Sequence, residues 1–206
     1  MRGSIAAAVV CLTWFAAVVV RADEPAAAEQ PARQPSASPA DSTPCLRPPV
    51  DIRRRHIEDA IRISLTTCDG APNLAVLDEL SALARPRTTP RPTREAMEAY
   101  RRTHPDHTSW LVQGSRRLHE GLLVRLQALA DRWPDRGIEI NSGYRPNARR
   151  GSRHRTGRAL DLSVDGVHRE EVAAFARSFS DTGVGYYPRS TFTHIDVRDA
   201  SYHWVD

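Results

Sequence analysis

Two histidines and one aspartate in the C-terminal half of the chain constrain its fold more than any other feature. They are His154, Asp161 and His194. Two imidazoles and a carboxylate suit a catalytic zinc site, which uses three protein ligands and leaves one coordination position open. Asp161 follows His154 by seven residues, so the two can lie at the ends of a turn that enters a strand, and His194 would come from a second strand. A metal ion would then hold together segments that are distant in sequence.

These residues belong to a series of short motifs. The motifs are Ser-Gly-Tyr-Arg at 142–145, Ser-x-His-x-x-Gly-x-Ala-x-Asp at 152–161, Phe-x-His-Ile-Asp-Val at 192–197 and His-Trp at 203–204. In this order they resemble the zinc peptidoglycan peptidases, a superfamily that includes the D-Ala-D-Ala metallopeptidases, the lysostaphin-type enzymes and the hedgehog signalling domain. Within it the sequence resembles the murein endopeptidase K-like branch, a peptidase M15-like group also known as DUF882. The resemblance covers residues 115–206.

The resemblance implies that His154, Asp161 and His194 bind one Zn²⁺ ion and that the chain hydrolyses peptide cross-links in peptidoglycan. Taken singly, each residue has a plainer interpretation. His154 and Asp161 could be surface residues of an arginine-rich loop, and a lone histidine in an apolar strand is usually structural. Their combined spacing with Gly157 and Ala159 favours the metal site.

Other polar residues of the motifs are candidates for catalysis or substrate binding. Asp196 lies two positions after His194, so both project from one face of a strand, and Asp196 would either hold a histidine ring or act as an acid–base group. The resemblance implies that Arg145 points into the cleft, where it would bind a substrate carboxylate or stabilise an oxyanion; the alternative is a plain surface arginine. Further candidates for substrate binding are Ser142, Tyr144 and Tyr187.

The general base is the least defined part of the predicted site. Many carboxypeptidases of the superfamily carry a glutamate three residues before the last histidine ligand, and here that position is Thr191. The remaining candidates are His203 and Asp196. A histidine titrates near neutral pH and suits proton transfer, although His203 could equally pack against Trp204.

The sequence patterns predict an α+β fold, with helices on one face of a small, mainly antiparallel sheet. Apolar residues at helical spacing predict helices over 118–133 and 168–179, and strands are expected at 138–142, 159–164 and 191–197. Residues 182–185, Thr-Gly-Val-Gly, are predicted to form a turn. The resemblance implies the same architecture, that of the hedgehog domain and the D-Ala-D-Ala peptidases.

The N-terminal part of the chain is predicted to leave the cytoplasm and to hold little structure. Residues 1–22 have the pattern of a signal peptide, with an uncleaved anchor as the alternative. Residues 23–50 are rich in Pro, Ala and Ser and are predicted to be a disordered linker. The protein would therefore be exported to the periplasm or cell envelope, where Cys45 and Cys68 are expected to form a disulfide rather than remain free thiols.

The remaining sequence divides into two predicted parts. Residues 51–112 are expected to be a helical N-terminal extension, with helical patterns at 52–63, 74–83 and 95–102. Residues 113–206 are expected to be the zinc peptidase-like domain.

Composition limits the classes of partner. The mean hydropathy of −0.49 excludes a multi-span membrane protein, and no transmembrane span is expected after signal cleavage. The formal net charge is +4, and every one of the 29 basic residues is arginine. An exported location and the lack of aromatic residues between the arginines argue against a nucleic-acid partner. We expect a monomer that acts on peptidoglycan; a D-Ala-D-Ala-type carboxypeptidase and a non-catalytic zinc-containing cell-wall binding module are the alternatives.

Overall fold

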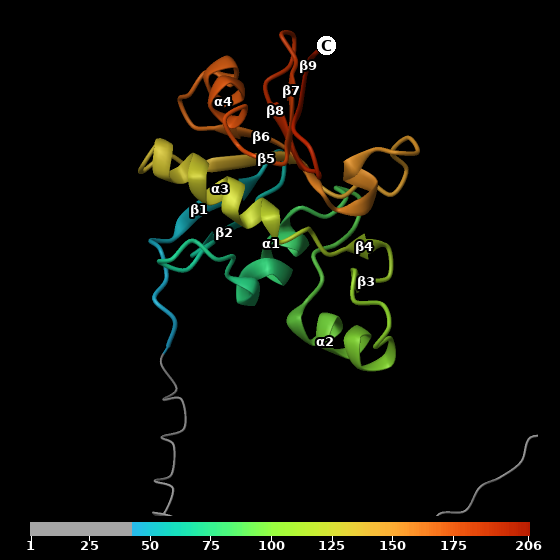
Figure 1. Cartoon of the computed structure of the whole chain (residues 1–206). Helices are drawn as coiled ribbons and strands as arrows, with labels where there is room; N and C mark the ends of the chain where they lie inside the picture. The colour runs from blue at the N-terminus through green and yellow to red at the C-terminus, as the bar shows by residue number, and fades with distance from the viewer. Residues whose placement is uncertain (1–42) are drawn as a thin grey trace, which may run out of the picture. The chain divides into compact units, whose positions relative to one another are not determined.

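A computed structural model describes residues 43–206, which form one compact unit (Figure 1). The predicted signal peptide and most of the predicted linker lie outside the described residues. Within them, no helix is both long enough and apolar enough to cross a membrane.

A seven-stranded sheet forms the centre of this unit. Its spatial order is β2-β1-β5-β6-β8-β7-β9. The strands are β1 (Val50–Arg54), β2 (Ala60–Ile63), β5 (Ile138–Ser142), β6 (Ala159–Val164), β7 (Thr182–Tyr186), β8 (Thr193–Val197) and β9 (Tyr202–Val205). A separate two-stranded sheet pairs β3 (Trp110–Val112) with β4 (Ser115–Arg116).

The predicted α+β class is confirmed, but the main sheet is mixed. β1 runs parallel to β5 and β7 runs parallel to β9, whereas the other neighbouring strands are antiparallel. The prediction of a mainly antiparallel sheet is therefore met only in part. It missed the parallel pairs because each joins strands whose contact depends on long-range topology and leaves no local pattern.

Two helices cover one face of the sheet. They are α3 (Gly121–Arg132) and α4 (Arg169–Ala176), and both contact β6 and β8 (Figure 1). Leucines spaced along α3 face apolar residues of these strands, and all belong to one buried cluster: Leu122, Leu126, Leu129, Leu160, Leu162 and Ile195. Because side chains alternate along a strand, the intervening residues of β6 and β8 project from the opposite face. The predicted helices at 118–133 and 168–179 are thus confirmed, although both are shorter than expected.

The predicted helical extension is wrong in its first part, because residues 52–63 form the β1–β2 hairpin. Val50, Ile52 and Arg54 are buried in alternation with exposed neighbours. The isoleucines of this segment fit both a helical and an alternating pattern, and pairing of β1 with β5 selects the strand. Residues 51–112 are therefore part of the same compact unit as residues 113–206.

The rest of this region follows the prediction more closely. A 3₁₀ turn, η1 (Leu74–Val76), leads into α1 (Leu77–Leu83), and α2 spans Arg94–Thr103. Leu80 and Leu83 of α1 join the main buried cluster. The disulfide between Cys45 and Cys68 is present, with a Cα–Cα distance of 5.4 Å.

The segment predicted as a turn at residues 182–185 is strand β7. Its glycines suggested a turn, but in the structure they allow close contact with neighbouring side chains. A Cβ atom on Gly185 would lie 2.6 Å from the indole of Trp204, and one on Gly183 would lie 2.3 Å from the guanidinium of Arg198. Glycine inside a strand often marks such an approach.

Candidate functional site

The face of the sheet opposite α3 and α4 carries two of the three residues that the sequence singled out, and the third lies beside it. Asp161 of β6 and His194 of β8 are direct partners in the strand register. His154 reaches them from the 3₁₀ helix η2 (Arg153–Thr156), which precedes β6. All three are buried, with at most 7% of any residue exposed. We refer to these three residues as the His–Asp–His cluster.

The polar atoms of the cluster converge on one point. His154 Nε2 lies 3.2 Å from Asp161 Oδ1 and 3.1 Å from His194 Nδ1. His194 Nδ1 lies 2.9 Å from Asp161 Oδ1. Ligand atoms at tetrahedral positions around zinc lie roughly 3.3 Å from one another. The spacing therefore suits three ligands of a single ion.

In each ring, the hydrogen bond made by the outer nitrogen shows that this nitrogen carries the proton. The other nitrogen, which faces the centre of the cluster, then has a free lone pair. His154 Nδ1 lies 2.7 Å from the carbonyl oxygen of Gly143, which can only accept, so this nitrogen carries the proton. His194 Nε2 likewise donates to Asp196 Oδ2 at 3.0 Å. In the neutral rings, two nitrogen lone pairs and a carboxylate oxygen then point at each other, an arrangement that a cation satisfies. This donor set fits a divalent metal ion.

Interactions within the cluster favour the ionised form of its aspartate and the protonated form of His194. Burial raises the pKa of Asp161, but hydrogen bonds from His154 and His194 outweigh burial and hold that pKa well below its ordinary value. For His194, burial lowers the pKa, and the bonds to Asp161 and Asp196 reverse the effect and raise it. Without a metal, a proton is thus favoured at the position that a cation would take.

Asp196 is fixed from two sides. Arg198 donates to it from Nε, at 2.7 Å to Oδ1, and from its terminal nitrogen to Oδ2. Burial raises the pKa of Asp196, but bonds from His194 and Arg198 outweigh it and leave the pKa below its usual range. The carboxylate therefore stays ionised and holds the ring of His194, which is the orienting one of its two predicted roles.

A left-handed glycine shapes the loop that presents His154. Gly157 ends η2 with φ of 70°, and its N–H bonds to the carbonyl oxygens of Arg153 and His154. A Cβ here would lie 2.5 Å from the carbonyl oxygen of Arg117. The backbone N–H of Arg145 also donates to His154 O at 3.1 Å. The Ser-Gly-Tyr-Arg motif and the histidine motif are thus joined by backbone contacts.

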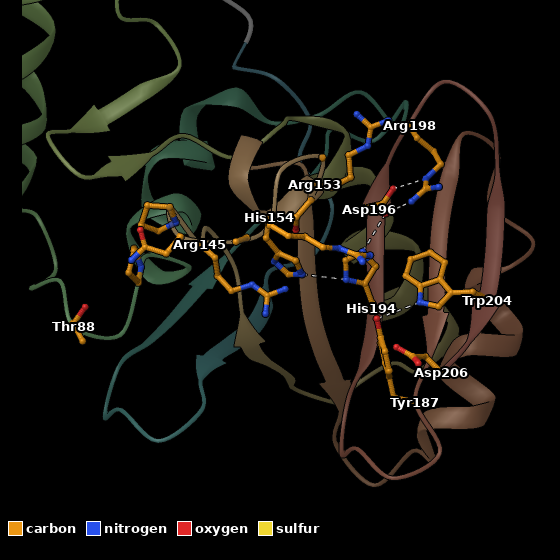
Figure 2. A pocket seen from close by; sticks show the side chains of 17 residues that line it. Thr88, Arg145, Arg153, His154, Tyr187, His194, Asp196, Arg198, Trp204 and Asp206 are labelled. Carbon is orange, nitrogen blue, oxygen red and sulfur yellow. Dashed lines mark hydrogen bonds and ion pairs between the residues drawn. The ribbon is translucent and has the colours of Figure 1, made fainter.

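An open cleft of about 790 Å³ lies over the cluster (Figure 2). His154 and His194 lie in its wall together with Arg145, Tyr187 and Trp204. A second pocket of about 500 Å³ is lined in part by Asp161. Arg145 and Pro86 line both hollows, so the two adjoin each other beside the cluster.

The predicted substrate-binding residues all line one of these hollows. Arg145 is half exposed, and its terminal nitrogen lies 3.8 Å from Asp161 Oδ2. Ser142 and Tyr144 line the second pocket, although Tyr144 is largely buried and packs edge-on against Trp110. Tyr187 lines the first, where its hydroxyl accepts a hydrogen bond from Trp204 at 3.2 Å.

His203 is not brought to the cluster. β9 pairs with β7 so that Trp204 lies opposite Gly185, and the Trp204 ring is 5.1 Å from the ring of His194. Because side chains alternate along a strand, His203 projects from the other face, where it is exposed. The His-Trp motif therefore supplies its tryptophan to the site. This placement is at odds with the predicted role of His203 as general base.

Sequence reasoning missed several residues of the site. Arg198, which holds Asp196, and Trp204, which covers His194, both contact strand glycines. The two glycines of β7 were the available signal. Arg54 and Arg87 of the second pocket were missed because they come from a region predicted to be a separate extension.

Comparison with known proteins agrees with this site. Residues 101–196 match a family described as Peptidase M15. Peptidoglycan L,D-endopeptidase MepK of Escherichia coli (strain K12) is 39% identical over 72 residues, which cover 34% of this chain and 39% of that protein. The probable peptidoglycan L,D-endopeptidase MepK of Haemophilus influenzae is 42% identical over 72 residues, which cover 29% of this chain and 39% of that protein. The match thus spans well under half the length of these relatives.

The family match contains the whole His–Asp–His cluster, as well as Arg145 and Asp196. It ends before β9 and begins after β1, β2 and α1. Residues 101–196 of this chain therefore resemble the peptidase M15 family in sequence.

Proposed function

We propose that this chain is a zinc-dependent peptidase that hydrolyses peptide cross-links in peptidoglycan. The observation that carries the proposal is the convergence of two imidazole lone pairs and a carboxylate in the wall of an open cleft. The names of the relatives, which are peptidoglycan L,D-endopeptidases, supply the substrate class. Such a substrate lies outside the cytoplasm, so the proposal includes export, and we propose that the protein acts as a monomer.

The cluster would hold the ion through His154 Nε2, Asp161 Oδ1 and His194 Nδ1. A zinc ion held there would polarise a substrate carbonyl and lower the pKa of a water molecule to about 7. Three protein ligands are the number typical of catalytic zinc sites.

Arg145 and Asp196 would support the reaction in different ways. The Arg145 guanidinium stands beside Asp161 and is half exposed to the cleft, so it can donate to a substrate carbonyl as negative charge develops there. Asp196 keeps His194 in the tautomer that leaves Nδ1 free. Tyr187 and Trp204 form an aromatic wall against which a peptide can pack.

A second candidate is a non-catalytic zinc-containing module that binds cell-wall peptides. It is favoured by two positions of the motifs that provide the cluster with no general base. Thr191 stands where many carboxypeptidases carry glutamate, and its hydroxyl accepts a hydrogen bond from Arg55 at 2.7 Å. His203 faces away from the cluster. Binding without cleavage is therefore a defined outcome of the test below.

The test is incubation of the purified protein with cross-linked murein, with and without a chelator, followed by separation of the muropeptides. We expect conversion of dimers to monomers that the chelator abolishes. His154→Ala should reduce this conversion to background because it removes a ligand, whereas His104→Ala, which alters an exposed histidine of the loop after α2, should not.

Each other outcome has a distinct meaning. Dimers that stay intact but lose terminal residues would identify a carboxypeptidase. Intact murein together with measured zinc binding would identify the binding module. Full activity of His154→Ala would contradict the proposed metal site.

A further inference from the structure

Five of the twelve residues that line the second pocket precede the family match. We name it the arginine pocket. Its lining comes from the end of β1 and the turn after it, from the segment after α1, from the end of β5 and the loop after it, from β6 and from the loop before β8, and it includes Arg54, Arg55, Arg87, Arg145 and Asp161. It meets the cluster at Asp161 and the main cleft at Arg145. A peptide held over the cluster could therefore extend into it.

The arginine pocket has more positive charge than its acidic residues balance. Arg55 is paired with Glu139 at 3.5 Å, and Arg145 lies beside Asp161. Arg54 and Arg87 make no ion pair with any of residues 43–206. Arg87 only approaches the carbonyl oxygen of Asn141, at 3.5 Å.

Arg54 is the stronger evidence for a binding site, because only 4% of this residue is exposed. Its terminal nitrogens donate to the carbonyl oxygens of Ile140, at 3.1 Å, and Arg85, at 3.4 Å. Its Nε is buried and has no partner within the described part of the chain. Burying a charge without an opposite charge is costly, and such residues cluster at functional sites.

The surroundings of Arg54 show the same imbalance. Burial lowers its pKa, the nearby charges of Arg87 and Arg85 lower it by more than Asp161 and Asp59 raise it, and the net pKa is about 10. An anion in the pocket would relieve this repulsion. Guanidinium groups are the side chains best suited to bind a carboxylate through paired hydrogen bonds.

We infer that Arg54 and Arg87 form a carboxylate-binding subsite of the substrate cleft, so that residues 50–87 select acidic peptides for the site. This inference rests on the proposed function, since it takes the ligand to be a carboxylate of the wall peptide that crosses the cluster. It gives the region before the family match a role in specificity and assigns it no part in the chemistry.

The test measures binding to the metal-free protein by calorimetry, so that no cleavage is needed. The probes are a muropeptide with free carboxylates and the same muropeptide with those carboxylates amidated. We expect the wild-type protein to bind the free form about 10-fold more tightly, as the loss of one charge-assisted contact implies. Arg87→Gln, at an exposed position, should remove this preference.

Two further variants complete the test. Arg102→Gln makes the same change of charge on an exposed site of α2 and should keep the preference. Arg54→Met should lose the preference as Arg87→Gln does, provided that circular dichroism shows a folded protein. Equal binding of the two probes by the wild type, or an unchanged preference in Arg87→Gln, would overturn the inference.

Failure of this inference and failure of the proposed function can be told apart. Murein that is never hydrolysed would refute the peptidase while leaving a carboxylate preference measurable. Hydrolysis with no effect of Arg87→Gln on the preference would refute the subsite alone.

Discussion

At the scale of single residues, Asp196 links the His–Asp–His cluster to the rest of β8. It accepts from His194 Nε2 on one side and from Arg198 on the other. Partners that orient a ligating histidine typically contribute a factor of about 10 to 100 to metal affinity. The geometry of the cluster therefore depends on a carboxylate that does not itself face its centre.

Asp196→Asn should accordingly weaken zinc binding by about 10- to 100-fold, because the amide cannot hold the charge of Arg198 or fix the His194 tautomer. Competition with a chromophoric chelator measures this affinity. The matched control is Asp199→Asn, three residues away, whose side chain is 96% exposed. Equal affinities of the two variants would contradict the orienting role.

The same substitution has a consequence for acid stability. The pKa of Asp196 lies below its ordinary value in the folded chain, whereas an unfolded aspartate titrates near about 3.9. Its ionisation therefore stabilises the fold above that pH, and the contribution is lost as the pH falls towards the folded-state pKa. Below about pH 4, the free energy of unfolding should fall more steeply for the wild type than for Asp196→Asn.

At the scale of elements, the loop that carries His154 depends on two left-handed glycines with different surroundings. Gly151 has φ of 87° and open space where a Cβ would be, whereas Gly157 has φ of 70° and the carbonyl oxygen of Arg117 at 2.5 Å. Substitutions at these two glycines therefore separate two contributions to the free energy of unfolding, that of the backbone conformation and that of a steric clash.

Gly151→Ala should lower the free energy of unfolding by about 1–2 kcal/mol, the cost of the left-handed conformation. Gly157→Ala should cost at least about 1 kcal/mol more, because the methyl group must displace the chain before α3. Chemical denaturation measures both. Equal losses would show that the contact between Gly157 and Arg117 is not tight.

The elements also show what sequence patterns could reveal. The strands at 138–142 and 159–164 and both sheet-covering helices were predictable, since their apolar spacing is local. β1 was not predictable, because the isoleucines around Ile52 fit both a helical and a strand pattern. Only the pairing with β5 selects the strand. The three residues of the His–Asp–His cluster could be singled out from motif spacing, and the structure brings them together. Their orienting groups were less predictable, since one is a backbone carbonyl, Gly143 O, which leaves no mark in a sequence.

At the scale of the whole molecule, the segments before and after residue 113 form a single structure. Ile52 pairs with Ile138 in the parallel register, the N–H of Leu118 donates to the Ser81 hydroxyl at 2.9 Å, and the N–H of Tyr144 donates to Ala84 O at 3.0 Å. The predicted domain boundary at residue 113 therefore divides one core.

A fragment of residues 113–206 should consequently fail to unfold cooperatively, because it would expose the β5 edge and the apolar surface that α1 covers. Thermal unfolding followed by circular dichroism measures this, with residues 43–206 as the control. A sharp transition in the shorter fragment would show that residues 113–206 fold without their N-terminal neighbours.

Because the sequence contains no lysine, the positive charge of the cleft responds to salt but not to moderate changes of pH. Each of its permanently cationic side chains is a guanidinium, which keeps its proton far above neutral pH. The field of the exposed arginines decays over about 10 Å at 0.1 M salt and over less in brine. A shift of the medium from mildly acidic to mildly alkaline would leave this field unchanged. A rise in salinity would shorten the distance over which this field acts. The buried Arg54 would then be the cationic group whose attraction for an anion is screened least by salt.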